Sequence, residues 1–173
     1  SGRAGPNNAQ AFEGYINVQD IKYDEGTPYM FPAIPHTLLF QAAVDHGSFI
    51  HTNSWGNAPV PYGTEENLAD SFIWQNENFL LLFAAANWGP GKFTIQGHAT
   101  AKNMVTVGAS ANGRNAGNQA ITDHYFSSRG PTPDGRLKPD VMARGEGIWS
   151  AAACEPKPNC TGYVQFSGTS MAT

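Results

Sequence analysis

Ser170 lies in the stretch SGTSMAT (167–173), where a small, flexible lead-in meets what reads as the first turn of an apolar helix. A serine at such a position gains from the helix dipole and from backbone N–H groups that have no partner inside the helix. That environment suits a nucleophile whose attack on a carbonyl creates an oxyanion. Serine and threonine at helix starts are more often N-caps, so this stretch alone favours the capping interpretation.

Two further polar segments follow predicted buried strands. The segment NSWG (53–56) comes after FIHT, and NWG (87–89) comes after FLLLFAAA. Working residues of parallel α/β sheets sit in loops at the carboxyl ends of the strands, so these segments are candidate site residues. An Asn before Gly, as near Asn87, is often only a turn residue, and small residues such as 84–86 are often only core packing. Both interpretations stay open for the isolated segments.

The elements that must position these residues alternate along the first two thirds of the chain. Hydrophobic periodicity, capping residues and buried apolar runs predict strands at 15–21, 48–55, 79–86 and 103–110, and helices at 35–47 and 64–78, the second capped by Thr64. This order predicts an α/β fold, a mostly parallel twisted sheet with helices on both faces. The second half is rich in loops, with short strands expected near 124–127, 147–150 and 162–166.

The composition fits a packed, loop-rich globular protein. Ten Lys and Arg stand against 14 Asp and Glu, a net charge of -4, which excludes a polybasic nucleic-acid arm. Charged residues make up 14% of the 173 residues, and no apolar run is long enough to span a membrane. No signal-peptide pattern is present. The chain opens on a loop-like segment and closes inside an apparent helix, so we expect it to be part of a larger domain.

Five motifs occur in one order along the chain: HTNSWG (51–56), FAAANWGP (83–90), ATAKNMVTVGAS (99–110), FSSRGPTPDGRLKPDVMA (126–143) and SGTSMAT (167–173). In this order they resemble the subtilisin-like serine proteases, the subtilases, and look most like the larger multidomain members. The resemblance covers about residues 35–173. It implies a three-layer subtilisin-like fold, incomplete at both ends, with 1–173 forming part of one catalytic domain.

The resemblance also implies roles for individual residues. Ser170 matches the nucleophile, and Asn87 matches the side-chain donor of the oxyanion hole, with the backbone N–H of Ser170 as second donor. The segment that pairs with substrate backbone is matched by Ser54, Trp55 and Gly56. One wall of the pocket for the residue before the scissile bond is matched by Ala84, Ala85 and Ala86. An edge strand that binds an extended peptide and a wall of small residues suit these roles physically.

The general base and its orienting acid have no counterpart in this chain. Subtilases place Asp, His and Ser in that order, with the Asp in a D-[ST]-G strand end and the His in an H-G-T-H helix start. Asp45-His46-Gly47-Ser48 is a partial match, but Phe49 replaces the second His. We interpret His46 as the end of a helix, and His36, His51 and His124 as surface, strand or loop residues. The catalytic Asp and His are therefore expected upstream, and the chain alone is expected to be inactive.

Three positions depart from the family pattern. Ala86 stands where the family usually has Gly, directly before the oxyanion Asn, and its methyl would narrow the pocket or strain a backbone that prefers Gly. A small or medium residue before the cut is therefore expected. His98 replaces a common Pro, and Arg144 replaces the Pro of a loop packed close to the active site.

Cys154 and Cys160 bracket EPKPN in a predicted surface loop. Two cysteines this close favour a disulfide, and hence a secreted protein or an oxidising lumen, although two free thiols remain an alternative. A metal site is disfavoured because two ligands with no nearby His do not make one. Asn159-Cys160-Thr161 also fits the glycosylation pattern.

No cofactor is required by this interpretation. Many subtilases bind calcium, but no ligand set can be named, since Asp134 and Gly135 fit a turn and Asp140 fits a strand start. The expected function is a serine endopeptidase acting through an acyl-enzyme on Ser170. Its expected partners are a polypeptide substrate and the rest of the same domain. A catalytically inactive subtilase-like module with a binding or assembly role is the alternative, and artificial chain boundaries are a third possibility.

Overall fold

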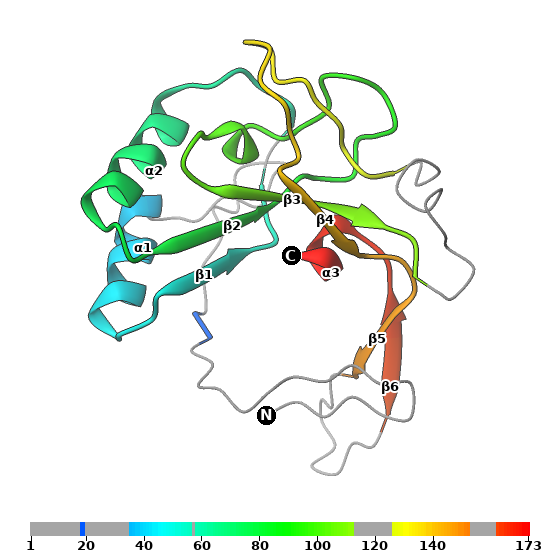
Figure 1. Ribbon diagram of the computed structural model, residues 1–173. Helices are drawn as coiled ribbons and strands as arrows, with labels where there is room; N and C mark the ends of the chain where they lie inside the picture. The colour runs from blue at the N-terminus through cyan, green and yellow to red at the C-terminus, as the bar shows by residue number, and fades with distance from the viewer. Residues whose placement is uncertain (1–17, 20–34, 57, 113–125, 153–161) are drawn as a thin grey trace.

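A four-stranded parallel sheet forms the centre of the computed structural model, which describes residues 18–19, 35–56, 58–112, 126–152 and 162–173. The strands lie side by side in chain order, β1 (Ile50–Asn53), β2 (Leu80–Ala84), β3 (Val105–Ser110) and β4 (Val141–Arg144) (Figure 1). All three neighbouring pairs are parallel. The predicted mostly parallel α/β sheet is therefore confirmed, while the predicted strand at 15–21 falls largely outside the described residues.

The helices lie on the two sides of this sheet. On one side, α1 (His36–Asp45) packs against α2 (Thr64–Gln75), and the short 3-10 helix η1 (His98–Thr100) contacts α2. On the other side, α3 (Thr169–Ala172) contacts β2, β3 and β4 (Figure 1). An antiparallel pair, β5 (Ile148–Ala151) and β6 (Tyr163–Phe166), leads from β4 into α3. The two predicted helices and the predicted strands at 48–55, 79–86 and 103–110 are confirmed with shorter bounds.

The core lies between β2 and the two helices on its face. Leu81 and Phe83 of β2 are buried, and they belong to one cluster with Phe40 of α1 and Phe72 of α2. The ring centroids of Phe40 and Phe72 are 5.6 Å apart, so the two helices meet through aromatic contact. Burial of these rings fixes the position of β2 relative to the two helices, and so fixes where the loop after Ala84 begins.

Local details differ from the sequence predictions at two places and agree with them at two others. Gly63, and not Thr64, caps α2, because its N–H donates to the Glu66 carboxylate at 2.7 Å. The strand start expected at Asp140 is confirmed by β4, which begins one residue later and pairs with β3. Residues 126 and 127 form a bend and not a strand. His46 is the C-cap of α1, as predicted.

Candidate active site

The predicted site residues meet at the carboxyl edge of the sheet. Ser54 follows β1 directly, Asn87 lies three residues after β2, and Ser170 lies in α3, which packs against β2, β3 and β4. Parallel strands deliver their carboxyl ends to a single edge, which is why segments far apart in sequence come together there. The contacts among these residues define the candidate active site.

The side chain of Asn87 is oriented by Thr169. Its Oδ1 accepts hydrogen bonds from the Thr169 backbone N–H at 2.9 Å and from the Thr169 hydroxyl at 3.1 Å. Two donors on one oxygen fix which end of the amide faces them, so Nδ2 faces away as the remaining donor. Nδ2 lies on the Gly168 side, where a Cβ added to Gly168 would be 3.6 Å from it. The amide donor therefore lies beside the turn that leads into Ser170.

Ser54 and Ser170 exchange hydrogen bonds across the gap between β1 and α3. The Ser54 hydroxyl donates to the Ser170 carbonyl at 3.2 Å, and the Ser170 hydroxyl donates to the Ser54 carbonyl at 3.4 Å. Ser54 is exposed and Ser170 is half-buried. The Ser170 hydroxyl is thus accessible, in a weak bond that a stronger acceptor can replace.

The turn before Ser170 is anchored to the end of β4. The Gly168 N–H donates to the Gly145 carbonyl at 2.8 Å, and the Gly145 N–H donates to the Ser110 carbonyl at 3.0 Å. Gly145 must be a glycine, because an added Cβ would lie 2.6 Å from both the Gly168 carbonyl oxygen and the Ala109 Cβ. Arg144, the departure from the family pattern, is exposed at the strand end, with Nη1 3.5 Å from Asn112 Oδ1.

Gln96 joins the ends of β1 and β2. Its Nε2 donates to the Trp55 carbonyl at 3.2 Å and, in a short bond, to the Ala84 carbonyl. The Gly56 backbone lies so close to the Gln96 side chain that any Cβ at Gly56 would overlap Oε1. Gln96 is 2% exposed and was not predicted, because a lone Gln between Ile95 and Gly97 carries no motif. Its partners lie in the segment after β1 and at the last residue of β2.

The three alanines after Phe83 occupy different environments. Ala84 and Ala85 are buried in the core, whereas Ala86 is half-buried with φ of +84°. That dihedral lies in the left-handed region, where a Cβ costs roughly 1–2 kcal/mol. The expected backbone strain at Ala86 is therefore present. Of the three, Ala86 is the one with surface to offer a ligand.

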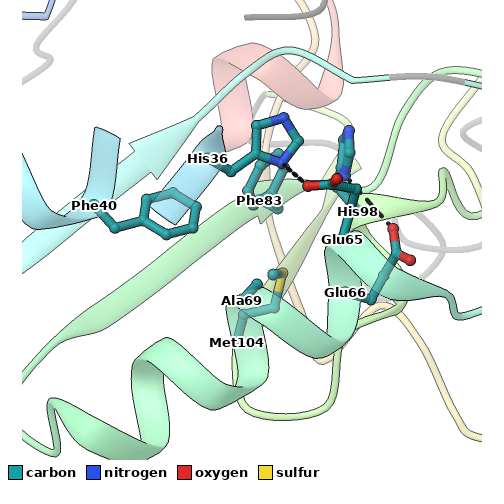
Figure 2. A pocket seen from close by; sticks show the side chains of 8 residues that line it. All are labelled: His36, Phe40, Glu65, Glu66, Ala69, Phe83, His98 and Met104. Atoms are coloured by element: carbon teal, nitrogen blue, oxygen red, sulfur yellow. Dashed lines mark ion pairs between the residues drawn. The ribbon is translucent and has the colours of Figure 1, made fainter. Parts of the chain in front are cut away.

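A polar cluster of His36, His98, Glu65 and Glu66 lines a small pocket (Figure 2), and Trp55 packs against its two histidine rings. His36 Nδ1 is 3.1 Å from Glu65 Oε2, and His98 Nδ1 is 3.5 Å from Glu66 Oε1. The Trp55 ring centroid lies 4.9 Å from that of His36 and 5.2 Å from that of His98. His36 was expected at a surface, strand or loop position. This was wrong, since it begins α1 and is 9% exposed, covered by Trp55 and His98.

The cluster changes the proton affinity of its members. Burial, reinforced by neighbouring His98, lowers the pKa of His36 from 6.5 to about 4, and Glu66 opposes that change only in part. Burial by itself would raise the pKa of Glu66. Hydrogen bonds from His98 and from the Gly63 N–H outweigh it and leave the pKa of Glu66 lowered. At neutral pH the polar cluster next to Trp55 therefore contains a neutral His36 and an ionised Glu66.

The acidic residues of the 126–143 motif have structural partners. Asp140 Oδ2 is 2.6 Å from the buried Lys138 ammonium and accepts the Thr106 N–H at 2.7 Å, which joins β4 to β3. Asp134 accepts from Arg136 at 2.9 Å and from the Thr132 hydroxyl at 2.6 Å within a turn. Within the described ranges no group of three or more His, Cys, Asp or Glu is placed to hold a metal ion. Cys154, Cys160, Asn159 and His124 lie outside those ranges.

Comparison with protein-family models assigns the chain to a family. Residues 10–173 match the model of the subtilase family, Peptidase_S8. The chain is a subtilase. Most of its length is covered, including all five motifs and every residue of the candidate active site.

Similarity to individual proteins is consistent with this membership. The chain is 36% identical to pyrolysin of Pyrococcus furiosus over 154 residues, which cover 76% of this chain and 11% of pyrolysin. It is 39% identical to serine protease AprX of Bacillus subtilis over 98 residues, covering 52% of this chain and 22% of AprX. Among solved structures it is similar to the patellamide maturation protease PatA, with 29% identity and a TM-score of 0.56. That match covers 80% of this chain and 44% of the PatA chain.

The chain thus spans less than half the length of each of these relatives, from 11% of pyrolysin to 44% of the PatA chain. No helix in the described ranges is long and apolar enough to cross a bilayer.

Proposed function

We propose that this chain forms the part of a subtilisin-type serine endopeptidase that carries the nucleophile and the oxyanion hole. The observation that supports this most is the Asn87–Thr169 contact, which aims a free-standing amide donor at the turn before Ser170. Ser170 follows Thr169 directly, so the same residue holds the Asn87 amide and precedes the nucleophile in the chain. A donor fixed before the reaction begins stabilises developing negative charge without reorganising.

In this mechanism the Ser170 hydroxyl attacks the carbonyl of the scissile bond after a histidine, supplied by the remainder of the protease domain, takes its proton. The carbonyl oxygen becomes an oxyanion, which the Asn87 amide and the Ser170 N–H bind. As the C–N bond breaks, the histidine gives its proton to the departing amine half of the substrate, and an acyl-enzyme remains on Ser170. Water then hydrolyses this ester and releases the acid half.

The segment Ser54–Gly56 serves as the edge that pairs with an extended polypeptide substrate, and the Ala84–Ala86 segment serves as one wall of the pocket next to it. Gln96 supports both, since it bonds the Trp55 and Ala84 carbonyls. The methyl group of Ala86 limits this pocket to a small or medium side chain. Peptide profiling of wild type against Ala86→Gly tests this, and an unchanged preference would count against it.

A fluorophosphonate probe on the whole protein that contains this chain tests the nucleophile. Native protein should become labelled on Ser170, and Ser170→Ala should lose the label. Ser167→Ala is the matched control, because Ser167 lies three residues away and its hydroxyl accepts from the Gly147 N–H. Labelling should survive there. Absence of labelling, under conditions that label a control subtilase, would sink the proposal.

A non-catalytic subtilase-like module with a binding or assembly role is the second candidate. The strained backbone of Ala86, directly before Asn87, favours it together with the departures at His98 and Arg144. A module of this kind would bind an extended peptide without cleaving it or reacting with the probe. A protease would do both.

Secretion, or residence in an oxidising lumen, is the compartment that we propose from Cys154 and Cys160. Thiol titration of the intact protein with and without reductant tests the pairing on which this rests. We also propose that catalysis itself needs no cofactor, and we assign no calcium ligands.

A further inference from the structure

Ser128 bonds both peptide groups that flank Asn87. Its N–H donates to the Ala86 carbonyl at 2.9 Å, and its hydroxyl accepts from the Trp88 N–H at 3.1 Å. The first group belongs to the peptide unit before Asn87 and the second to the unit after it. Ser128 itself is 0% exposed, so neither bond competes with water.

The neighbouring contacts extend this pairing. The Gly89 N–H donates to the Phe126 carbonyl at 2.9 Å. Any Cβ at Gly89 would overlap the Ser127 carbonyl, so a glycine is needed for the two segments to approach this closely. The loop that holds Asn87 is therefore secured along its length by residues 126–128.

The two adjacent serines have different targets. The Ser127 hydroxyl accepts from the Ala109 N–H in β3 at 3.0 Å. Ser127 thus attaches the segment to the sheet, while Ser128 attaches the Asn87 loop to the segment. Both are buried, with exposures of 2% and 0%. They form a matched pair that differs chiefly in what the hydroxyl bonds.

The Asn87 loop needs such support for two reasons. Asn87 itself is exposed, and Ala86 before it holds a φ of +84° that a non-glycine residue adopts only when its surroundings impose it. The two bonds from Ser128 begin at the carbonyl of that strained residue and end at the Trp88 N–H, so they bracket Asn87. Thr169 orients the end of the Asn87 side chain, but it does not fix the backbone from which the side chain extends.

We propose that Ser128 is a positioning residue for the oxyanion-hole amide, because it clamps the peptide groups on both sides of Asn87. This rests on the proposed role of Asn87. Displacement of a catalytic group by about 1 Å can cost ~10²-fold in rate, so a clamp on its backbone acts on catalysis without touching substrate.

The test compares Ser128→Ala with Ser127→Ala in the whole protein that contains this chain, using kcat and KM on a peptide substrate together with urea unfolding midpoints. Each variant loses one buried hydrogen bond, so both should lower the midpoint by similar amounts. Ser128→Ala should in addition lower kcat about fivefold or more with little change in KM, the signature of a transition-state defect. Ser127→Ala should keep kcat within about twofold of wild type.

Two further variants keep the outcome decisive. Ser128→Cys retains a weak acceptor and should give a kcat between those of wild type and Ser128→Ala. In an Asn87→Ala background, Ser128→Ala should lose most of its effect on kcat, since the group it positions is gone.

Distinct results separate failure of the clamp from failure of the proposed function. An unchanged kcat in Asn87→Ala would overturn the oxyanion role itself, and the clamp with it. A large loss in Asn87→Ala, together with equal kcat values for Ser128→Ala and Ser127→Ala, would overturn the clamp alone. A full, additive effect of Ser128→Ala in the Asn87→Ala background would also overturn it.

Discussion

Thr169 donates both its backbone N–H and its hydroxyl to a single oxygen of Asn87, a residue 82 positions earlier in the chain. Thr169 is 1% exposed, so both bonds form away from water. Thr169 thus has two structural roles: it begins the helix that carries Ser170, and it sets the direction of the Asn87 amide that we propose as the oxyanion donor.

Thr169→Val should lower kcat by about fivefold while changing KM little, because it removes one of the two donors that orient Asn87 and preserves the shape of the side chain. Steady-state kinetics on the whole protein measures this. Thr169→Ser keeps the hydroxyl and should stay close to wild type. Equal losses of kcat in both variants would contradict a specific role of the hydroxyl.

Ala86→Gly should raise the free energy of unfolding by up to about 1 kcal/mol, because relief of the left-handed strain outweighs the entropy that a glycine adds to the unfolded chain. Urea unfolding measures this. Ala85→Gly is the matched control. Ala85 is fully buried and its φ is not positive, so that substitution should lower the unfolding free energy by about 1 kcal/mol or more. Destabilisation by both would contradict the strain at Ala86.

Asp140→Asn should lower the free energy of unfolding by about 1–3 kcal/mol, because it removes the negative charge that pairs with the buried Lys138 ammonium. Lys138 is 3% exposed in its side chain, whereas Asp140 is 38% exposed, which moderates the loss. Asp134→Asn, which weakens a surface pair with Arg136, should change stability little. Similar effects of the two substitutions would mean that burial of Lys138 does not matter.

Acidification from pH 6.5 to about 4 should destabilise the fold. The pKa of His36 is about 4 in the folded protein and 6.5 when unperturbed, so the unfolded chain binds more protons across this window. The free energy of unfolding therefore rises with pH there and is lost as pH falls. His51, whose pKa burial also lowers, acts in the same direction.

His36→Gln should make this pH dependence shallower between pH 5 and 6.5, above the range in which Glu66 becomes protonated and adds its own loss. Unfolding midpoints over that interval measure the slope. His46→Gln, at the exposed end of α1, controls for loss of a histidine elsewhere. A slope as steep in His36→Gln as in His46→Gln would show that His36 is not the group responsible.

Local patterns predicted the elements whose formation depends on neighbours in sequence. The helix α2 and the strand β2 follow from an acidic first turn and from a continuous apolar run. The sequence predicted a strand start at Asp140, but not the pairing of β4 with β3 or the Lys138–Asp140 contact before it, because both are tertiary. The cap at Gly63 escaped prediction because the partner is a side chain three residues later, and not the cap's own.

The candidate site divides in the same way. Ser170 and Asn87 stand in ordered motifs, so both could be named as candidate site residues from the sequence. Gln96 and Ser128 could not, because each acts through bonds to carbonyl or N–H groups of distant segments that any residue type would offer. The burial of His36 likewise depends on Trp55 and His98, which approach it only in the folded protein.

The parallel pairing of the sheet has a consequence for how the protein reaches its native state. Each ladder joins residues tens of positions apart, such as Ile50 with Leu80 and Val107 with Val141. The chain must close long loops before any of these contacts rewards it, which makes folding slow compared with that of a helical domain of similar size. The contact between Asn87 and Thr169 closes an even longer loop, of 82 positions. Probe reactivity of Ser170 during refolding should therefore appear late, after the helical signal of α1 and α2 has recovered.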